Sequence, residues 1–171
     1  MSQYLAAPRH DHLEQVVRIF AYLKYNSSFP LRFRTEEMDI DGECFTETDW
    51  SDIYENAAEV IPLNMSKPAG IEVKLTVFVD TNHAGNKLNR RSHTVFIIFF
   101  NSAPIIWYSK KQNTVESSSF GSEYNALRIA MEQVISLRHK LRMFGTPVVG
   151  PAGISAIMKR FRNLTVTYPR P

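Results

Sequence analysis

A chain of 171 residues with 44% hydrophobic residues is long and apolar enough to bury a core, which argues against intrinsic disorder and for one domain. Its single cysteine, Cys44, excludes an internal disulfide and a cysteine-based zinc site. The longest apolar run, residues 95–100, is far shorter than the roughly 20 residues of a membrane span, and residues 1–10 lack a signal-peptide core, so we expect an intracellular protein without a membrane partner.

The net charge of +3 conceals opposite charges in the two halves of the chain. Residues 1–80 carry 7 Lys and Arg against 14 Asp and Glu, a balance of −7, whereas residues 81–171 carry 13 against 3, a balance of +10. A basic half is typical of proteins that bind polyanions such as nucleic acid. An ordinary solvated surface gives the same composition, so charge alone leaves both interpretations open.

The first predicted element is a helix that ends near Tyr25. Asp11 and Glu14 have the spacing of a capping box, which places the N-cap at Asp11. The apolar residues recur at helical spacing and form one stripe, composed of Leu13, Val16, Val17, Phe20 and Leu23. Such a stripe needs a surface to pack against, and we expect the sheet of the same chain to supply it.

Residues 31–72 are predicted to form an acidic linker or insertion. Acidic residues predominate from Glu36 to Glu59, and apolar anchors are few. The acidic cluster at 39–47 lacks the glycine and the closing glutamate of a calcium loop, so we interpret it as a solvated loop.

A sheet is predicted to follow this segment. In the run 73–80, VKLTVFVD, every second residue is apolar, which predicts a strand with one buried face and with Asp80 on the other face at its end. The β-branched and aromatic runs 95–100 and 105–109 are joined by turn-forming residues and should form an antiparallel hairpin. Adjacent residues of a strand point to opposite faces, and we expect Trp107 in the core rather than stacked on a base.

A long helix is predicted after the sheet. The three serines at 117–119 offer N-cap hydroxyls, and apolar residues recur at helical spacing from Tyr124 to Phe144. Glu123 then lies in the first turn of the helix, near the sheet. The predicted fold class is α+β (mixed α/β), with a three-stranded antiparallel sheet, a long helix and a preceding N-terminal helix.

Four motifs, in this order, give the sequence a family resemblance. They are V-F-V-D-T-N-H-A-G-N (77–86), R-R-S-H-T (90–94), I-I-W-Y-S-K-K-Q (105–112) and S-S-F-G-S-E-Y-N-A-L (118–127). Together they resemble the ribonuclease H region of copia-type LTR retrotransposon Pol polyproteins, and residues 8–24 are similar to the end of the reverse transcriptase domain. The resemblance implies a reverse transcriptase terminal helix in 1–30 and an incomplete ribonuclease H-like domain in 73–152. It is absent from the acidic linker in 31–72.

The resemblance also implies a chemistry. The family's fold is a mixed sheet in which three antiparallel strands are followed by a helix and then by further strands and helices. Its members hydrolyse the RNA strand of RNA·DNA hybrids with two Mg²⁺ ions, which prefer carboxylate oxygens. Asp80 and Glu123 match two of the family's catalytic, metal-binding acids.

Basic residues are expected beside these acids, where they would contact the phosphates of the hybrid. They are His83, Arg90, Arg91, Lys110 and Lys111. Loop charges without a partner would look the same in the sequence. The expected partners are an RNA·DNA hybrid or other nucleic acid and the upstream reverse transcriptase domain of a polyprotein.

The sequence departs from the family after Ala152. In the family the next strand ends in an Asp, the third metal ligand, but this chain has no Asp after Asp80. Glu132 lies about 13 Å beyond Glu123 along the helix axis and cannot replace that Asp. We therefore expect a truncated or frame-shifted copy with a divergent tail at 153–171.

The missing acid decides between two functional hypotheses. The first is a Mg²⁺-dependent ribonuclease H-type endonuclease, active within a larger polyprotein. The alternative is a non-catalytic retroelement remnant that binds nucleic acid through its basic half. Two carboxylates without a third would hold Mg²⁺ weakly, so for this chain alone we expect little or no hydrolysis.

Overall fold

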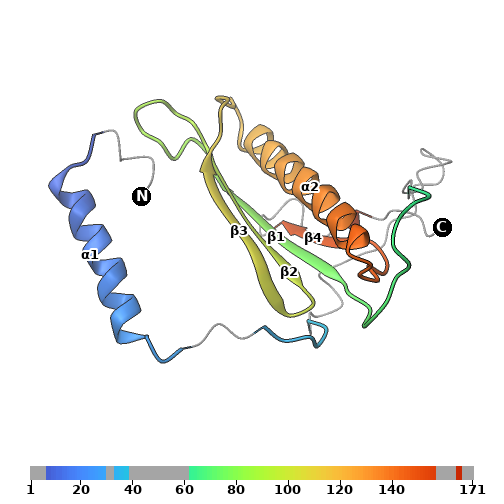
Figure 1. The fold of residues 1–171 in the computed structure, drawn as a ribbon. Coiled ribbons are helices and arrows are strands. Elements are labelled where there is room, and N and C mark those ends of the chain that lie inside the picture. Colours follow the sequence, from blue (N-terminus) through green and yellow to red (C-terminus); the bar gives the residue numbers. More distant parts are fainter. Residues whose placement is uncertain (1–6, 30–32, 39–61, 157–164, 167–171) are drawn as a thin grey trace. The chain divides into compact units, whose positions relative to one another are not determined.

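The computed structural model describes residues 7–29, 33–38, 62–156 and 165–166 (Figure 1). The chain divides into two units, residues 1–32 and residues 33–171. Cys44 and the acidic cluster at 39–47 lie outside the described residues.

The first unit contains one helix, α1, which spans His10–Tyr25. It begins two residues earlier than predicted, with Arg9 at the N-cap, so the proposed N-cap at Asp11 is wrong. The backbone N–H of Arg9 donates to Nδ1 of His12 at 3.0 Å. None of the residues of α1 is buried within its own unit, and Phe20 of the apolar stripe is 66% exposed. The expected packing of the stripe on the sheet stays a prediction.

The second unit is a mixed sheet covered by a long helix. Its elements in chain order are β1 (Leu75–Asn82), β2 (His93–Phe100), β3 (Ala103–Lys111), α2 (Ser119–Met143), β4 (Ala152–Ala156) and β5 (Thr165–Val166). The strand order is β3-β2-β1-β4-β5. The predicted α+β class is confirmed, as are the strand, the hairpin and the long helix.

The sheet is larger than predicted. β1, β2 and β3 form the expected antiparallel ladder. β4 adds to the free side of β1 in parallel, with Thr76 opposite Gly153 and Val79 opposite Ala156, and β5 pairs antiparallel with β4. The prediction of a three-stranded sheet is therefore corrected to five strands. β4 also crosses the boundary drawn at residue 152 between the domain and the divergent tail.

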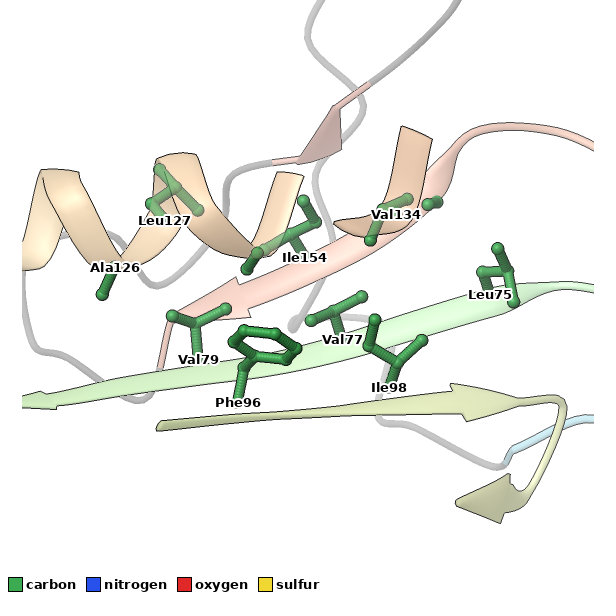
Figure 2. Packing of buried hydrophobic residues seen from close by; sticks show 11 residues of the cluster. Leu75, Val77, Val79, Phe96, Ile98, Ala126, Leu127, Val134 and Ile154 are labelled. Carbon is green, nitrogen blue, oxygen red and sulfur yellow. The ribbon is translucent and has the colours of Figure 1, made fainter. Parts of the chain in front are cut away.

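The hydrophobic core lies between α2 and one face of the sheet. In Figure 2, side chains of β1, β2 and β4 point toward the helix. The fully or nearly fully buried members are Leu75, Val77, Val79, Phe96, Ile98, Ala126, Leu127, Ala130, Val134, Ala152 and Ile154. The alternation in β1 thus determines the core face as predicted, because every second residue of the strand faces α2.

The prediction that Trp107 lies in the core is wrong. Trp107 is 69% exposed and pairs with Ile97, which points away from the core face. Its neighbour Tyr108 occupies the core side and stacks on the buried Phe96 with ring centroids 4.7 Å apart. Trp107 falls on the other face because the register of β2 and β3 places it beside Ile97 rather than beside Phe96 or Ile98.

Residues 33–38, near the start of the predicted acidic linker, are hydrogen-bonded to the sheet. Nδ2 of Asn101, in the turn between β2 and β3, donates to the carbonyl of Thr35 at 2.7 Å. The backbone N–H of Ser102 donates to the carbonyl of Glu36 at 3.0 Å. Residues 33–38 therefore belong to the second unit and lie at the hairpin end of the sheet.

Candidate functional site

The acid predicted on the first strand lies near the end of β1. Asp80 is exposed, and the strand continues past it through Thr81 to Asn82, so Asp80 is not the last residue of the strand. The strand has the predicted length of 8 residues but begins and ends later than predicted, because Thr81 and Asn82 still pair with β2. The backbone N–H of Thr81 donates to Oδ1 of Asp80 at 2.8 Å, which restrains the carboxylate.

The second acid lies near the amino end of α2. The predicted serine cap is confirmed, because Ser118 is the N-cap and its Oγ accepts from the backbone N–H of Gly121 at 3.1 Å. Glu123 is the fifth residue of the helix, partly buried, and follows Ser122, which is fully buried. The helix therefore begins where the sequence predicts, but Glu123 lies just past the first turn, so the prediction that it lies in the first turn is wrong.

Hydrogen bonds attach this end of α2 to the sheet. Nδ1 of His83, just after β1, lies 3.2 Å from Oγ of Ser122. Nε2 of Gln112, just after β3, donates to the carbonyl of Ser122 at 2.9 Å and to Oγ1 of Thr94 at 3.0 Å. The end of β1, the start of β2, the end of β3 and the start of α2 thus meet at one end of the sheet.

The predicted basic residues gather at this same end. Lys110 and Lys111 end β3 opposite Thr94 and His93, and the remaining ones lie in the loop from 83 to 92. The loop is held by a backbone bond from Gln112 to the carbonyl of Ser92 at 2.8 Å. Lys110 and Arg90 are exposed, whereas His83, Arg91 and Lys111 are partly buried.

The charges of this basic group are not neutralised within the described part of the chain. The ion pairs found there are His10 with Glu14, Lys74 with Glu37 and Arg128 with Glu132. None of them involves Arg90, Arg91, Lys110 or Lys111. These four side chains are therefore available to a polyanion as far as the described residues are concerned.

The acids that the structure describes are too few for a two-metal site. The family's metal ions need several converging carboxylates, and β4, the strand after α2, has the sequence AGISA without an acid. Among the residues that the structure describes, no group of three or more His, Cys, Asp or Glu could hold a metal ion. Weak binding of one Mg²⁺ by Asp80 and Glu123 stays a prediction.

The sequence did not identify the polar residues that link these elements. Gln112 and Thr94 are buried, and neither was assigned a role. Gln112 is the last residue of the motif at 105–112, directly after Lys110 and Lys111. Its polar side chain at the end of an apolar strand is the one feature of the sequence that could have indicated a role. Only the tertiary structure shows that it contacts α2.

Neither helix in the described ranges is both long and apolar enough to cross a bilayer.

A distant relative is found among curated proteins. No family model matches the sequence, and no significantly similar solved structure was found. The chain is 36% identical over 69 residues to secreted RxLR effector protein 161 of Plasmopara viticola, a match that covers 40% of this chain and 49% of that protein. The chain therefore spans about half the length of the curated relative that it matches.

Proposed function

We propose that this chain is a fragment of a copia-type retrotransposon reverse transcriptase/ribonuclease H polyprotein that binds nucleic acid without hydrolysing it. The order of the elements supports the proposal: three antiparallel strands, a long helix, and then a strand parallel to β1. This agrees with the mixed sheet of the family that the four motifs resemble. Residues 8–24, similar to the end of the reverse transcriptase domain, form most of the separate helix α1.

One observation carries the proposal. The four motifs are spread over about 50 residues of sequence, yet their functional positions come together at one end of the sheet. Asp80 lies near the end of β1, Ser122 next to Glu123 is bonded to His83, and Lys110 and Lys111 lie opposite the start of β2. A basic loop next to acids is the arrangement expected of a surface that holds a phosphate backbone near a hydrolytic centre.

Catalysis is the part of the family's function that we propose to be lost. Mg²⁺ bound at a complete site would supply Lewis-acid activation of the water and the leaving oxygen. Here Asp80 and Glu123 are the only matching ligands, and the strand after the helix brings no third carboxylate. The alternative of an active endonuclease needs an acid from elsewhere, for example from the rest of a polyprotein.

The cellular setting follows from the same proposal. A retroelement Pol fragment would act inside the cell, on an RNA·DNA hybrid or another nucleic acid, and beside an upstream reverse transcriptase domain. The name of the Plasmopara relative describes a secreted effector, but that statement concerns the relative, of which this chain matches 49%.

Binding to an RNA·DNA hybrid tests the proposal directly. We expect weak binding with little sequence preference at low ionic strength and a steep loss with added salt, because each neutralised phosphate releases a counterion. In fluorescence anisotropy titrations, Lys110→Gln/Lys111→Gln should weaken binding and reduce the slope of log K against log salt by about 0.9 per lost phosphate contact.

A matched control uses the same substitution on an exposed lysine far along α2. Lys140→Gln should leave both the affinity and the salt slope unchanged. The binding proposal fails if the parent does not bind at low salt, if its binding is insensitive to salt, or if Lys140→Gln has the same effect as the double variant.

Hydrolysis is tested separately with Mg²⁺ or Mn²⁺ and a labelled hybrid. We expect cleavage at least about a thousandfold slower than that of a complete two-metal site, because each metal contributes several kcal/mol and about 1.4 kcal/mol corresponds to tenfold in rate. Asp80→Asn and Glu123→Gln should then change nothing measurable. Robust cleavage by the parent that both variants abolish would show that a further acid completes the site.

A further inference from the structure

Gln112 has the surroundings of a side chain that holds other groups in place. It is 3% exposed, and its Nε2 donates both to Oγ1 of Thr94 on β2 and to the carbonyl of Ser122 on α2. A primary amide nitrogen has two N–H groups, so both donors are used. The side chain therefore connects the second strand to the long helix across the end of the core.

The acceptor of the second bond is next to a candidate site residue. The carbonyl of Ser122 belongs to the peptide unit that joins Ser122 to Glu123. The helix already sets the plane of this peptide, and the bond to its carbonyl adds a restraint that ties the base of the Glu123 side chain to β2. The 2.9 Å distance is that of an ordinary strong amide bond.

The Ser122 hydroxyl determines the protonation pattern of His83. Its Oγ lies 2.7 Å from the carbonyl of Ser119, which can only accept, so the single hydroxyl proton of Ser122 is directed there. Oγ can then only accept from the ring nitrogen of His83 that lies 3.2 Å away. In its neutral form His83 must therefore carry its proton on Nδ1, which leaves Nε2 as an acceptor.

We propose that Gln112 is a positioning residue of the candidate site: its amide clamps the Ser122–Glu123 peptide to β2, and the clamped Ser122 holds His83 as the Nδ1–H tautomer. The inference rests on the proposed function only in that Glu123 and His83 are the residues positioned. It predicts a defined orientation for both groups before any nucleic acid or metal binds.

Packing alone does not account for a glutamine here. Oε1 of Gln112 is buried and has no hydrogen-bond partner among the described residues. An unpartnered buried acceptor destabilises a fold, whereas an apolar side chain of similar length would fill the same space without that cost. The two bonds from Nε2 are what the glutamine adds.

The test uses the full-length chain without metal or nucleic acid. Gln112→Met keeps the length of the side chain and removes both donors. Amide hydrogen exchange at residues 122–124 should accelerate at least about tenfold, whereas that of Val77 and Phe96 in the sheet should not change. Gln133→Met, at an exposed position of α2, is the matched control and should leave both regions unchanged.

The imidazole ¹⁵N spectrum of His83 gives a second readout, which would not change if Gln112 only filled space in the fold. In a spectrum recorded at pH 8.5, His83 of the parent should show a protonated Nδ1 and an unprotonated Nε2. Gln112→Met and Ser122→Ala should shift this pattern toward a mixture of tautomers. A parent His83 protonated on Nε2 would overturn the proposal, as would unchanged exchange and an unchanged ¹⁵N pattern in Gln112→Met.

A second variant covers the case in which Gln112→Met does not fold. Thr94→Val removes the other acceptor of the clamp at constant volume, and it should accelerate exchange at residues 122–124 in the same way. Unchanged exchange in a folded Thr94→Val protein would contradict the clamp. None of these measurements depends on nucleic-acid binding. The clamp can therefore be confirmed even if the proposed function fails, and the clamp can fail while the chain still binds nucleic acid.

Discussion

The two faces of the sheet carry similarly apolar side chains but differ in burial. On the face that α2 covers, Val77, Phe96 and Ile98 are almost completely buried. On the opposite face Ile97 is partly buried and Trp107 is 69% exposed. The difference arises because α2 is the only helix of the second unit within its described residues, and it packs on one face. An apolar face becomes core only when another element covers it.

The largest expected effect tests this difference with one aromatic residue from each face. Phe96→Ala should lower the free energy of unfolding by about 3–5 kcal/mol, because it opens a cavity in the packed core. Trp107→Ala should cost less than about 1 kcal/mol, since most of the side chain is already in water. Urea unfolding of both variants measures the two effects. Equal losses would show that another part of the protein covers the Trp107 face.

A smaller loss of stability is expected from substitutions in the turn between β2 and β3. Asn101 is 6% exposed, has φ of 51° and accepts at Oδ1 from the backbone N–H of Lys74 at 2.9 Å. Asn101→Ala should cost about 2–3 kcal/mol, because it removes the side-chain bonds and because alanine tolerates the left-handed region less well than asparagine does.

Asn101→Gly separates these two causes. Glycine adopts positive φ readily, so this variant should recover about 1 kcal/mol of the loss and leave the cost of the missing bonds. Unfolding curves of the two variants that coincide would contradict a conformational contribution at this turn.

Local sequence determines some elements of this fold and leaves others to tertiary pairing. β1, the hairpin and α2 were predicted because alternation, turn residues and serine caps act within a few residues. β4 was missed because Ala, Gly and Ser have little strand propensity, and pairing with β1, far away in sequence, forms this strand. Trp107 was placed on the wrong face because alternation identifies two faces without saying which one α2 covers.

The candidate site shows the same division between local and tertiary information. Asp80 and Glu123 could be located on their elements from sequence, since a strand end and a helix start have local signals. The role of Gln112 could not, because it depends on a bond to Ser122 across the fold. The stripe of α1 illustrates the same limit, since its helical period is local and correct, whereas the surface that it packs against stays a prediction.

The smallest expected loss of stability concerns the start of α2, the helix that covers one face of the sheet. Ser118→Ala removes the Oγ that accepts from Gly121, and it should lower the free energy of unfolding by about 1 kcal/mol. Ser117→Ala, one residue earlier and outside the cap, is the matched control and should be nearly neutral. The cost stays small because burial of Ala126, Leu127 and Val134 against the sheet holds most of α2 in place. A loss in Ser118→Ala as large as that of Phe96→Ala would mean that the cap, rather than the packing, keeps α2 on its face of the sheet.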